Sequence, residues 1–168
     1  MEDYMSLKRC FPLLLLAFFA LLPLDAATVS FIIIETGLDM EADANQNSSL
    51  WENGLFDVFF DSGHIVSNAP LLRLGRLPKD DFPAEALNEL DEAIEGGVDF
   101  FIVTLLEFPD SGRASSLKPR QITLRLFRVQ PLELLHEQIY PGIRAGRNDR
   151  DEFDNLKQAA RSLVPHIR

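Results

Sequence analysis

Asp57, Asp61 and His64 are the residues whose types and spacing best fit a metal site. They fall at positions i, i+4 and i+7, with Asn53 one turn earlier, so a helix would place them along one face. Carboxylates and an imidazole are ligands for a divalent cation such as Zn²⁺. The alternative is a solvated polar stripe, with His64 just beyond the end of the helix. Because no fourth convergent ligand is evident, we expect the polar stripe and no resident metal or other cofactor.

Two carboxylates lie at the ends of expected strands. Glu35 directly follows the first strand, where α/β sheets place ligand groups, and Glu107 is near the far end of the central strand. Together they could form a pair for acid–base catalysis. The alternative, which we favour, is two strand-end carboxylates that face water. Ser111 and Ser115 have no base at a fixed spacing, so nothing in the sequence predicts an enzyme, although a hydrolase with an unrecognised site stays an alternative.

Arginine residues are concentrated in the carboxyl-terminal third of the chain, whereas many acidic residues lie in 39–52 and 80–95. This polarity could steer an acidic protein partner, or the acidic helix of a neighbouring copy, to a basic surface. Strand alternation is expected to expose one of these arginines to solvent at position 125. The alternative is an ordinary mixed surface. The candidates for partner binding are Arg125, Arg128, Arg144 and Arg147.

The amino-terminal segment predicts export. A run of 14 mostly apolar residues, Phe11–Leu24, follows two basic residues and precedes Asp25-Ala26-Ala27, the pattern of a secretory signal peptide. The run is shorter than the roughly 20 residues that span a bilayer as a helix. We therefore expect cleavage after Ala26, from a start at Met1 or Met5. The alternative is a protein anchored in the membrane through residues 11–24.

Cleavage would leave residues 27–168 as a single periplasmic or secreted domain. The only cysteine, Cys10, lies in the removed segment, so a hydrophobic core rather than disulfides must stabilise the domain. Residues 1–26 carry a net charge of −1 of the total −10, which leaves −9 for the remainder. Such acidity disfavours nucleic acid as a partner, and membrane association is expected only if the signal is not cleaved.

Hydrophobic patterns predict alternating strands and helices. Val29–Ile34 and Val98–Phe108 are nearly continuous apolar runs, typical of strands buried on both faces. Gln121–Leu126 alternates as an antiparallel edge strand would, with a phase slip at Phe127-Arg128 that suggests a bulge. Gln130-Pro131 permits a turn into a partner strand. Weaker or returning strands are expected at His64–Val66, Leu71–Leu77 and Leu132–Tyr140.

Three helices are expected between and after these strands. The first should span Leu50–Ser62, open on a Ser49–Glu52 capping box, and bury Trp51. Because further apolar residues, Phe56 and Phe60, widen its apolar face, this helix should be covered on more than one side. The second should begin near Asp81 and bury Leu87, Leu90 and Ile94, and the third should begin near Asp151 and end or kink near Pro165.

The order β–α–β–α–β–β–β–α predicts a single-domain α/β sandwich of two or three layers. Its mixed sheet should have about five strands and pack against three helices. After cleavage the chain would have about 140 residues, a length typical of a domain with one hydrophobic core.

This pattern resembles a superfamily of bacterial envelope domains. The matching features are the first strand, a helix with Trp51 followed by Gly54-Leu55, and Gly96–Thr104 (GGVDFFIVT), which is similar to the group's GADYIVTG pattern. Ile122–Leu135 is similar to its VRLRLIDVETGEVL hairpin. The group includes the amino-terminal domain of TolB, the periplasmic domain of curli-type secretion channels, flagellar outer-membrane accessory proteins and activators of penicillin-binding proteins.

The resemblance implies a protein that acts through protein–protein contacts or self-assembly and not as an enzyme. We therefore expect an exported envelope protein whose partner is another envelope protein or a second copy of itself. A small-ligand or metal-binding periplasmic module using Asp57, Asp61 and His64 is the first alternative.

Overall fold

The computed structural model describes residues 26–38, 46–76, 82–109, 118–142 and 149–167. The expected signal peptide up to residue 25 lies outside these ranges, as do Ser111, Ser115, Arg144 and Arg147. Within the described ranges, no helix has both the length and the apolar character needed to cross a membrane.

The two most apolar runs of the chain form the centre of the sheet, as the sequence predicted. In β4 (Phe100–Glu107) every residue is buried, and in β1 (Thr28–Thr36) every residue after the first is buried. The strand order is β2-β1-β4-β5-β6, with β3 also paired to β1. β2, β3 and β4 run parallel to β1, whereas β5 and β6 are antiparallel to their neighbours. The other strands are β2 (Ile65–Asn68), β3 (Leu72–Leu74), β5 (Gln121–Arg128) and β6 (Glu133–Pro141).

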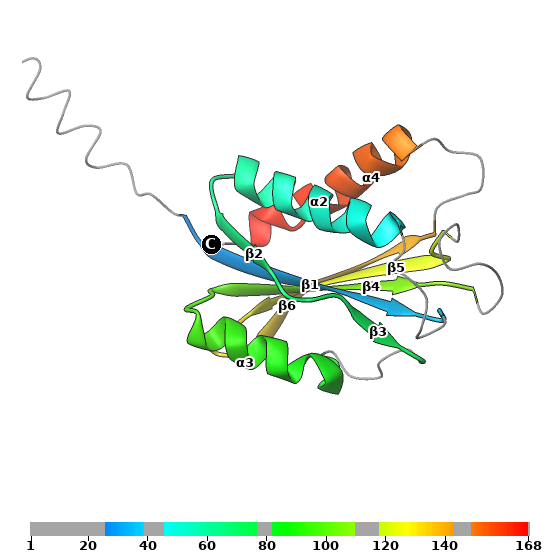
Figure 1. Ribbon diagram of the computed structural model, residues 1–168. Helices are drawn as coiled ribbons and strands as arrows, with labels where there is room; N and C mark the ends of the chain where they lie inside the picture. The colour runs from blue at the N-terminus through cyan, green and yellow to red at the C-terminus, as the bar shows by residue number, and fades with distance from the viewer. Residues whose placement is uncertain (1–25, 39–45, 77–81, 110–117, 143–148, 168) are drawn as a thin grey trace, which may run out of the picture.

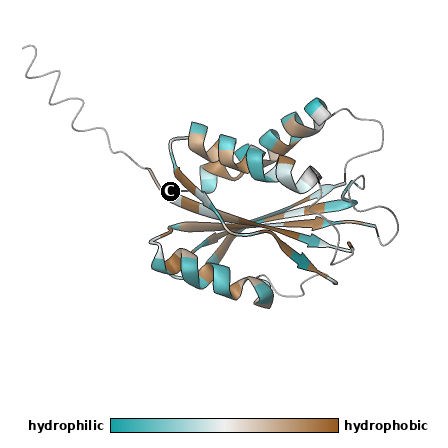
Figure 2. Cartoon of the chain, viewed as in Figure 1, coloured by the Kyte–Doolittle hydropathy of each residue, from teal (hydrophilic) through white to brown (hydrophobic). Residues whose placement is uncertain are grey.

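Three helices enclose this mixed sheet and make the domain a three-layer α/β sandwich (Figure 1). α2 (Gln46–Asp61) and α4 (Asp149–Arg161) cover one face, and α3 (Leu87–Glu95) covers the other. The sheet therefore separates two apolar clusters, one under α2 and α4 and a smaller one over α3. Figure 2 shows the strands mostly brown between helices whose outward surfaces are largely teal.

The expected amino-terminal cap of α2 is wrong, whereas its expected end is confirmed. The helix begins at Gln46, so Ser49 lies inside its first turns, and the Glu52 carboxylate instead accepts a hydrogen bond from the Asn68 side chain. At the other end Gly63 has a φ of 86°, which favours glycine. The same turn joins His64 N to the Phe59 carbonyl at 3.1 Å.

β5 is an internal strand, not the expected sheet edge, because β6 pairs with its outer side. The expected irregularity is confirmed, but the extra residue is on β6. Leu126 pairs with His136 and Phe127 with Leu134, which leaves Leu135 without a partner position. Phe127 continues the alternation of β5 and is buried in the cluster over α3. The strand alternation therefore continues without a slip. Phe127 is apolar because α3 covers its position on the sheet face that carries Arg125.

α3 buries part of the stripe that was expected. Leu90 is buried and Ile94 packs against the same cluster, as predicted, but Leu87 is 47% exposed, and Ala86 and Ala93 are buried as well. The element opens with a 3₁₀ turn at Ala84–Ala86, whose tighter winding changes the angular phase of the residues that follow.

Candidate interaction surface

Glu35 is an internal ion-pair partner and does not face water, which corrects the expectation from the sequence. Its side chain is fully buried beneath the first turns of α2, where it accepts a hydrogen bond from Ser48 Oγ. Arg73, directly opposite in β3, donates from Nε and Nη2 to Glu35 Oε2 at 2.8 and 2.6 Å. Glu35 thus ties β1 to β3 and α2.

Glu107 lies on the opposite face of the sheet from Glu35, so the two carboxylates do not form a catalytic pair. In the β1–β4 register Glu35 is paired with Leu106, and Glu107 with Thr36. Since consecutive side chains of a strand point to opposite faces, this one-residue offset separates the carboxylates. Glu107 is 5% exposed and accepts a hydrogen bond from Gln121 Nε2 at 2.7 Å. It is therefore also buried and paired, contrary to the expectation of a water-facing group.

Asp57 and Asp61 lie in the last turns of α2 and His64 lies just beyond its end, and Asp57 and His64 have separate contacts. Asp57 Oδ2 forms an ion pair with Lys157 Nζ of α4 at 2.8 Å. His64 Nδ1 accepts a hydrogen bond from the Ala27 backbone N–H at 3.3 Å, and partial burial lowers the pKa of His64 from its ordinary value of 6.5. Among the described residues, no three or more His, Cys, Asp or Glu side chains are placed to hold a metal ion.

The two described arginines of the expected basic surface are engaged across the β5–β6 hairpin. Arg125 pairs with Glu137 at 2.6 Å, and Arg128 with Glu133 at 3.0 Å, each directly opposite its partner. The Arg125 side chain is only 14% exposed, so the expectation that it points to solvent is wrong. A role of these residues in partner binding stays a prediction.

Exposed apolar side chains gather instead at the opposite edge of the sheet, beside β2. Phe60, Ile65 and Phe56 are 64%, 63% and 42% exposed, and the two phenylalanine rings stack with centroids 6.3 Å apart. We call these three residues the edge patch. Large apolar side chains that cluster at a surface mark sites of interaction more often than single ones do.

The helix stripe that carries the two phenylalanines runs alongside β2. Glu52, Phe56 and Phe60 are spaced at i, i+4 and i+8, and Glu52 is hydrogen-bonded to Asn68 at the end of β2. The other side of α2 faces α4, through the Asp57 ion pair described above. The sequence predicted Phe56 and Phe60 to be covered; they are uncovered because α4 packs on only one flank of α2.

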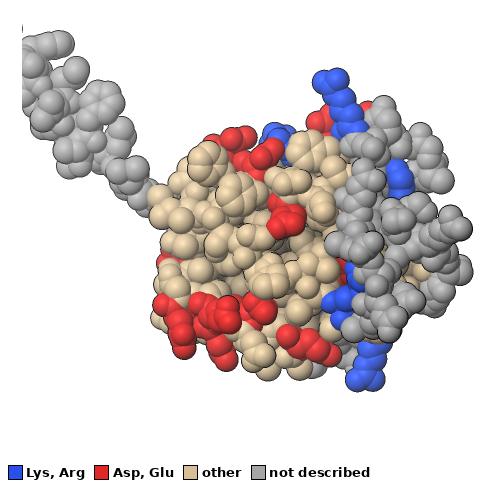
Figure 3. Space-filling model, viewed as in Figure 1, with Lys and Arg blue, Asp and Glu red and all other residues tan. Residues whose placement is uncertain are grey.

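The face around this edge is largely uncharged at its centre. Figure 1 views the molecule from the side of β2 and β3, and Figure 3 shows the same face with a broad tan area that includes one acidic side chain and has further acidic side chains above and below it. The acidic groups below lie over α3. Their exposed members are Glu85, Asp91, Glu92 and Glu95. In the described part of the chain, these four carboxylates have no ion-pair partner.

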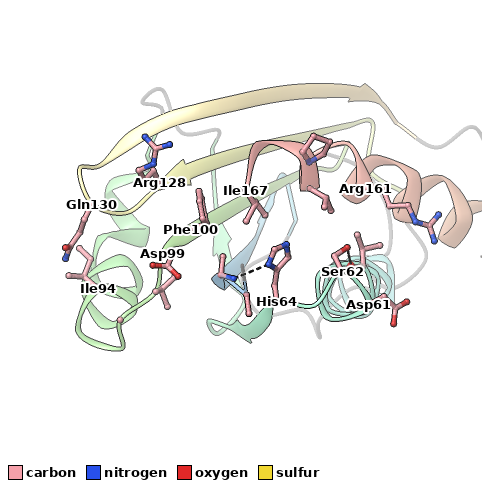
Figure 4. Close-up of a pocket in the computed structure, with 17 residues that line it drawn as sticks. Asp61, Ser62, His64, Ile94, Asp99, Phe100, Arg128, Gln130, Arg161 and Ile167 are labelled. Carbon is pink, nitrogen blue, oxygen red and sulfur yellow. Dashed lines mark hydrogen bonds between the residues drawn. The ribbon is translucent and has the colours of Figure 1, made fainter. Parts of the chain in front are cut away.

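A hollow of about 1330 Å³ opens at the end of the sheet where β1 and β4 begin. Phe100 and Ile167 form part of its apolar lining, while charged groups of both signs surround it. Figure 4 shows Arg128 and Arg161 on opposite sides, with His64 between them and its hydrogen bond to the backbone of Ala27. The hollow therefore suits a polar molecule more than a purely apolar one.

Comparisons with known proteins found similar chains among solved structures. No family model matches the sequence, and no curated protein matches it. The chain is similar to PelC, from a dodecamer of Paraburkholderia phytofirmans, with 11% identity over 85% of this chain and 88% of that chain and a TM-score of 0.47. It is similar to TolB from Acinetobacter baumannii, with 14% identity over 83% of this chain and 27% of TolB and a TM-score of 0.38.

A third similar structure is the LpoB C-terminal domain from Escherichia coli, with 10% identity over 71% of this chain and 84% of that chain and a TM-score of 0.40. The likeness concerns the fold alone.

Proposed function

We propose that the chain is an exported, non-enzymatic envelope protein that acts by binding another protein through the edge patch. The observation that carries this proposal is the exposure of Phe56, Phe60 and Ile65 beside β2, whose outer side pairs with no strand among the described residues. Aromatic side chains contribute a large favourable free energy of binding when a partner removes them from water. Aromatic residues are also enriched at the centres of protein interfaces.

Two features support binding rather than catalysis. The carboxylates that could have formed an acid–base pair are on opposite faces of the sheet and have structural partners. The edge patch, by contrast, has no structural role within the described residues that would explain two exposed phenylalanines and an isoleucine. A protein that assembles with others has a use for such a surface.

Site-specific photo-crosslinking in the native cells tests this proposal. A photoreactive amino acid at Phe60 or Ile65 should trap a defined partner, whereas the same group at Leu87 or Ile139 should not. Leu87 and Ile139 are suitable controls because they are apolar and 47% and 56% exposed, but lie on α3 and β6. Equal crosslinking at all four positions, or none at Phe60 and Ile65, would contradict the proposal. Crosslinks from Phe60 to this same chain would indicate self-assembly.

Export is a second part of the proposal, with residues 1–26 as the signal peptide and 27–168 as the mature domain. Ala26 is exposed and Ala27 leads directly into β1, so a cut between them would leave the described fold whole. Mass spectrometry of the protein from its own cells should find Ala27 as the amino terminus, in the fraction released by osmotic shock. A Met1 or Met5 terminus in the membrane fraction would establish an anchor instead.

Small-ligand binding is the second candidate function, and the hollow near His64 favours it. Native mass spectrometry of the protein from its own cells should then show a stoichiometric small molecule. A Gln130→Trp variant, which places a large side chain at the rim, should lose it. A mass equal to that of the polypeptide alone would argue against this candidate.

A further inference from the structure

We infer that the edge patch binds an extended segment of another protein, which joins the sheet as a strand next to β2 and carries apolar residues between basic ones. This inference rests on the proposed function and names the binding mode and the partner chemistry. It depends on three features of the described residues: the backbone of β2, the side chains on its two sides, and the charges around them.

Within the described residues, the backbone of β2 has hydrogen-bonding groups on its outer side with which no strand pairs. Ile65 N donates to the Ala27 carbonyl at 3.0 Å, and Ala69 N to the Phe31 carbonyl at 2.8 Å, so these residues face β1. Backbone groups of successive residues alternate in a parallel pair, so Ser67 also faces β1 and the residues on either side of it point the other way. The N–H and C=O groups of Val66 and Asn68 therefore face outward, and no strand of the described sheet pairs with them.

Apolar side chains lie on both sides of this strand edge. Phe56 and Phe60 are on the α2 side, because their helix stripe runs along β2. Ile65 is on the α3 side, because it is in register with Thr28, whereas its neighbour Val66 packs into the cluster under α2. Successive side chains of an added strand alternate between these two sides, so one extended segment would cover all three residues of the edge patch. A helix laid on α2 would leave Ile65 exposed.

The length of β2 limits how much of the partner can pair. The strand has four residues, and Pro70, which has no N–H, follows it closely. Only a few backbone hydrogen bonds can form, so apolar contacts and charge must supply the rest of the binding free energy. This short edge also explains how the protein avoids unspecific pairing with other strands.

The charge of this face selects a basic partner over a second copy of the chain. The exposed carboxylates of α3 lie below the edge, and residues 27–168 carry a net charge of −9. An approaching copy would bring the same acidic groups toward them, whereas lysine or arginine side chains between the apolar residues of a partner would be attracted. The attraction should weaken with salt, because these charges are exposed.

A synthetic hexapeptide Lys-Val-Val-Lys-Val-Val, whose valines face both sides of an added strand, provides the test, and Glu-Val-Val-Glu-Val-Val is its control. The purified 27–168 domain should bind the basic peptide and not the acidic one, and binding should weaken as salt is raised. Amide hydrogen exchange should slow at Val66 and Asn68, the two outward-facing positions. Failure of the basic peptide to bind at low salt, or equal binding of both peptides, would overturn the inference.

A matched pair of substitutions tests the binding mode. Asn68→Ala removes the side chain but keeps the outward N–H, whereas Asn68→Pro removes that donor as well. We expect Asn68→Pro to bind the peptide about tenfold more weakly than Asn68→Ala, the effect of one lost backbone hydrogen bond. Circular dichroism and Trp51 fluorescence check that both variants fold.

The outcomes separate this inference from the proposed function. Equal peptide binding by the two Asn68 variants would refute strand addition, while crosslinking at Phe60 in cells would still support a protein-binding edge patch. If Phe60→Ser and the control Leu87→Ser bind the peptide equally and Phe60 gives no crosslink, both the inference and the proposed function fail.

Discussion

Removal of Arg73 should reveal whether Glu35 is a structural or a chemical group. The Glu35 side chain is 0% exposed and that of Arg73 10%, and two guanidinium nitrogens lie within 2.8 Å of Glu35 Oε2. Arg73→Met would remove this guanidinium from a buried carboxylate, a loss that costs about 3–5 kcal/mol of unfolding free energy. If the pair were exposed, the loss would be at most about 1 kcal/mol.

The double variant makes this prediction specific to charge. Replacing both partners by apolar residues, Glu35→Leu with Arg73→Met, also removes the buried carboxylate and should recover most of the loss, because buried ion pairs replaced in this way are often neutral or more stable by about 1–4 kcal/mol. Urea unfolding at pH 7, followed by Trp51 fluorescence, measures all variants. An Arg73→Met protein within about 1 kcal/mol of the wild type would refute the reasoning.

Three further predictions concern the layer formed by α2 and α4 and the end of α2. Trp51 is 3% exposed, so Trp51→Ala should lower the unfolding free energy by about 3–5 kcal/mol. Trp51→Phe should cost less, because the Trp51 Nε1 has no hydrogen-bond partner in the described structure. Equal urea midpoints for the wild type and Trp51→Ala would show that this packing is wrong. Gly54→Ala should destabilise the fold despite a gain of about 1 kcal/mol in helix propensity, since its Cβ would lie 1.8 Å from Leu156 Cδ2. In a Leu156→Ala background the same change should cost nothing, and an equal loss in both backgrounds would contradict the contact. The pKa of His64 is lower in the folded state than in the unfolded chain, so the unfolded chain binds more protons and stability should fall as pH drops below about 6.5. His64→Gln should weaken this pH dependence of the unfolding free energy in urea titrations. An unchanged pH profile would exclude the effect.

The local sequence pattern was sufficient to predict those elements whose features depend only on residues near one another in the chain. β1 and β4 are recognisable because a continuous apolar run can only be stable where both faces are covered. The buried face of α2 and the turn at Gly63 are similarly local, since helical periodicity and a positive φ depend on residues near in sequence. The α/β sandwich and its mixed sheet follow from the order of these elements.

The candidate site could not be predicted from the sequence, because it depends on strand register and helix packing, which only the tertiary structure shows. Periodicity marks Phe56 and Phe60 as apolar, but whether they are covered depends on which flank of α2 the distant α4 occupies. The positions of Glu35 and Glu107 depend on the β1–β4 register, where a shift of one residue exchanges the two faces of the sheet. The exposure of Arg125 depends on the pairing of β6 with β5. Sequence alone therefore determined the elements and their order, whereas register and packing decided which side chains face a partner, because both join residues that are far apart in the chain.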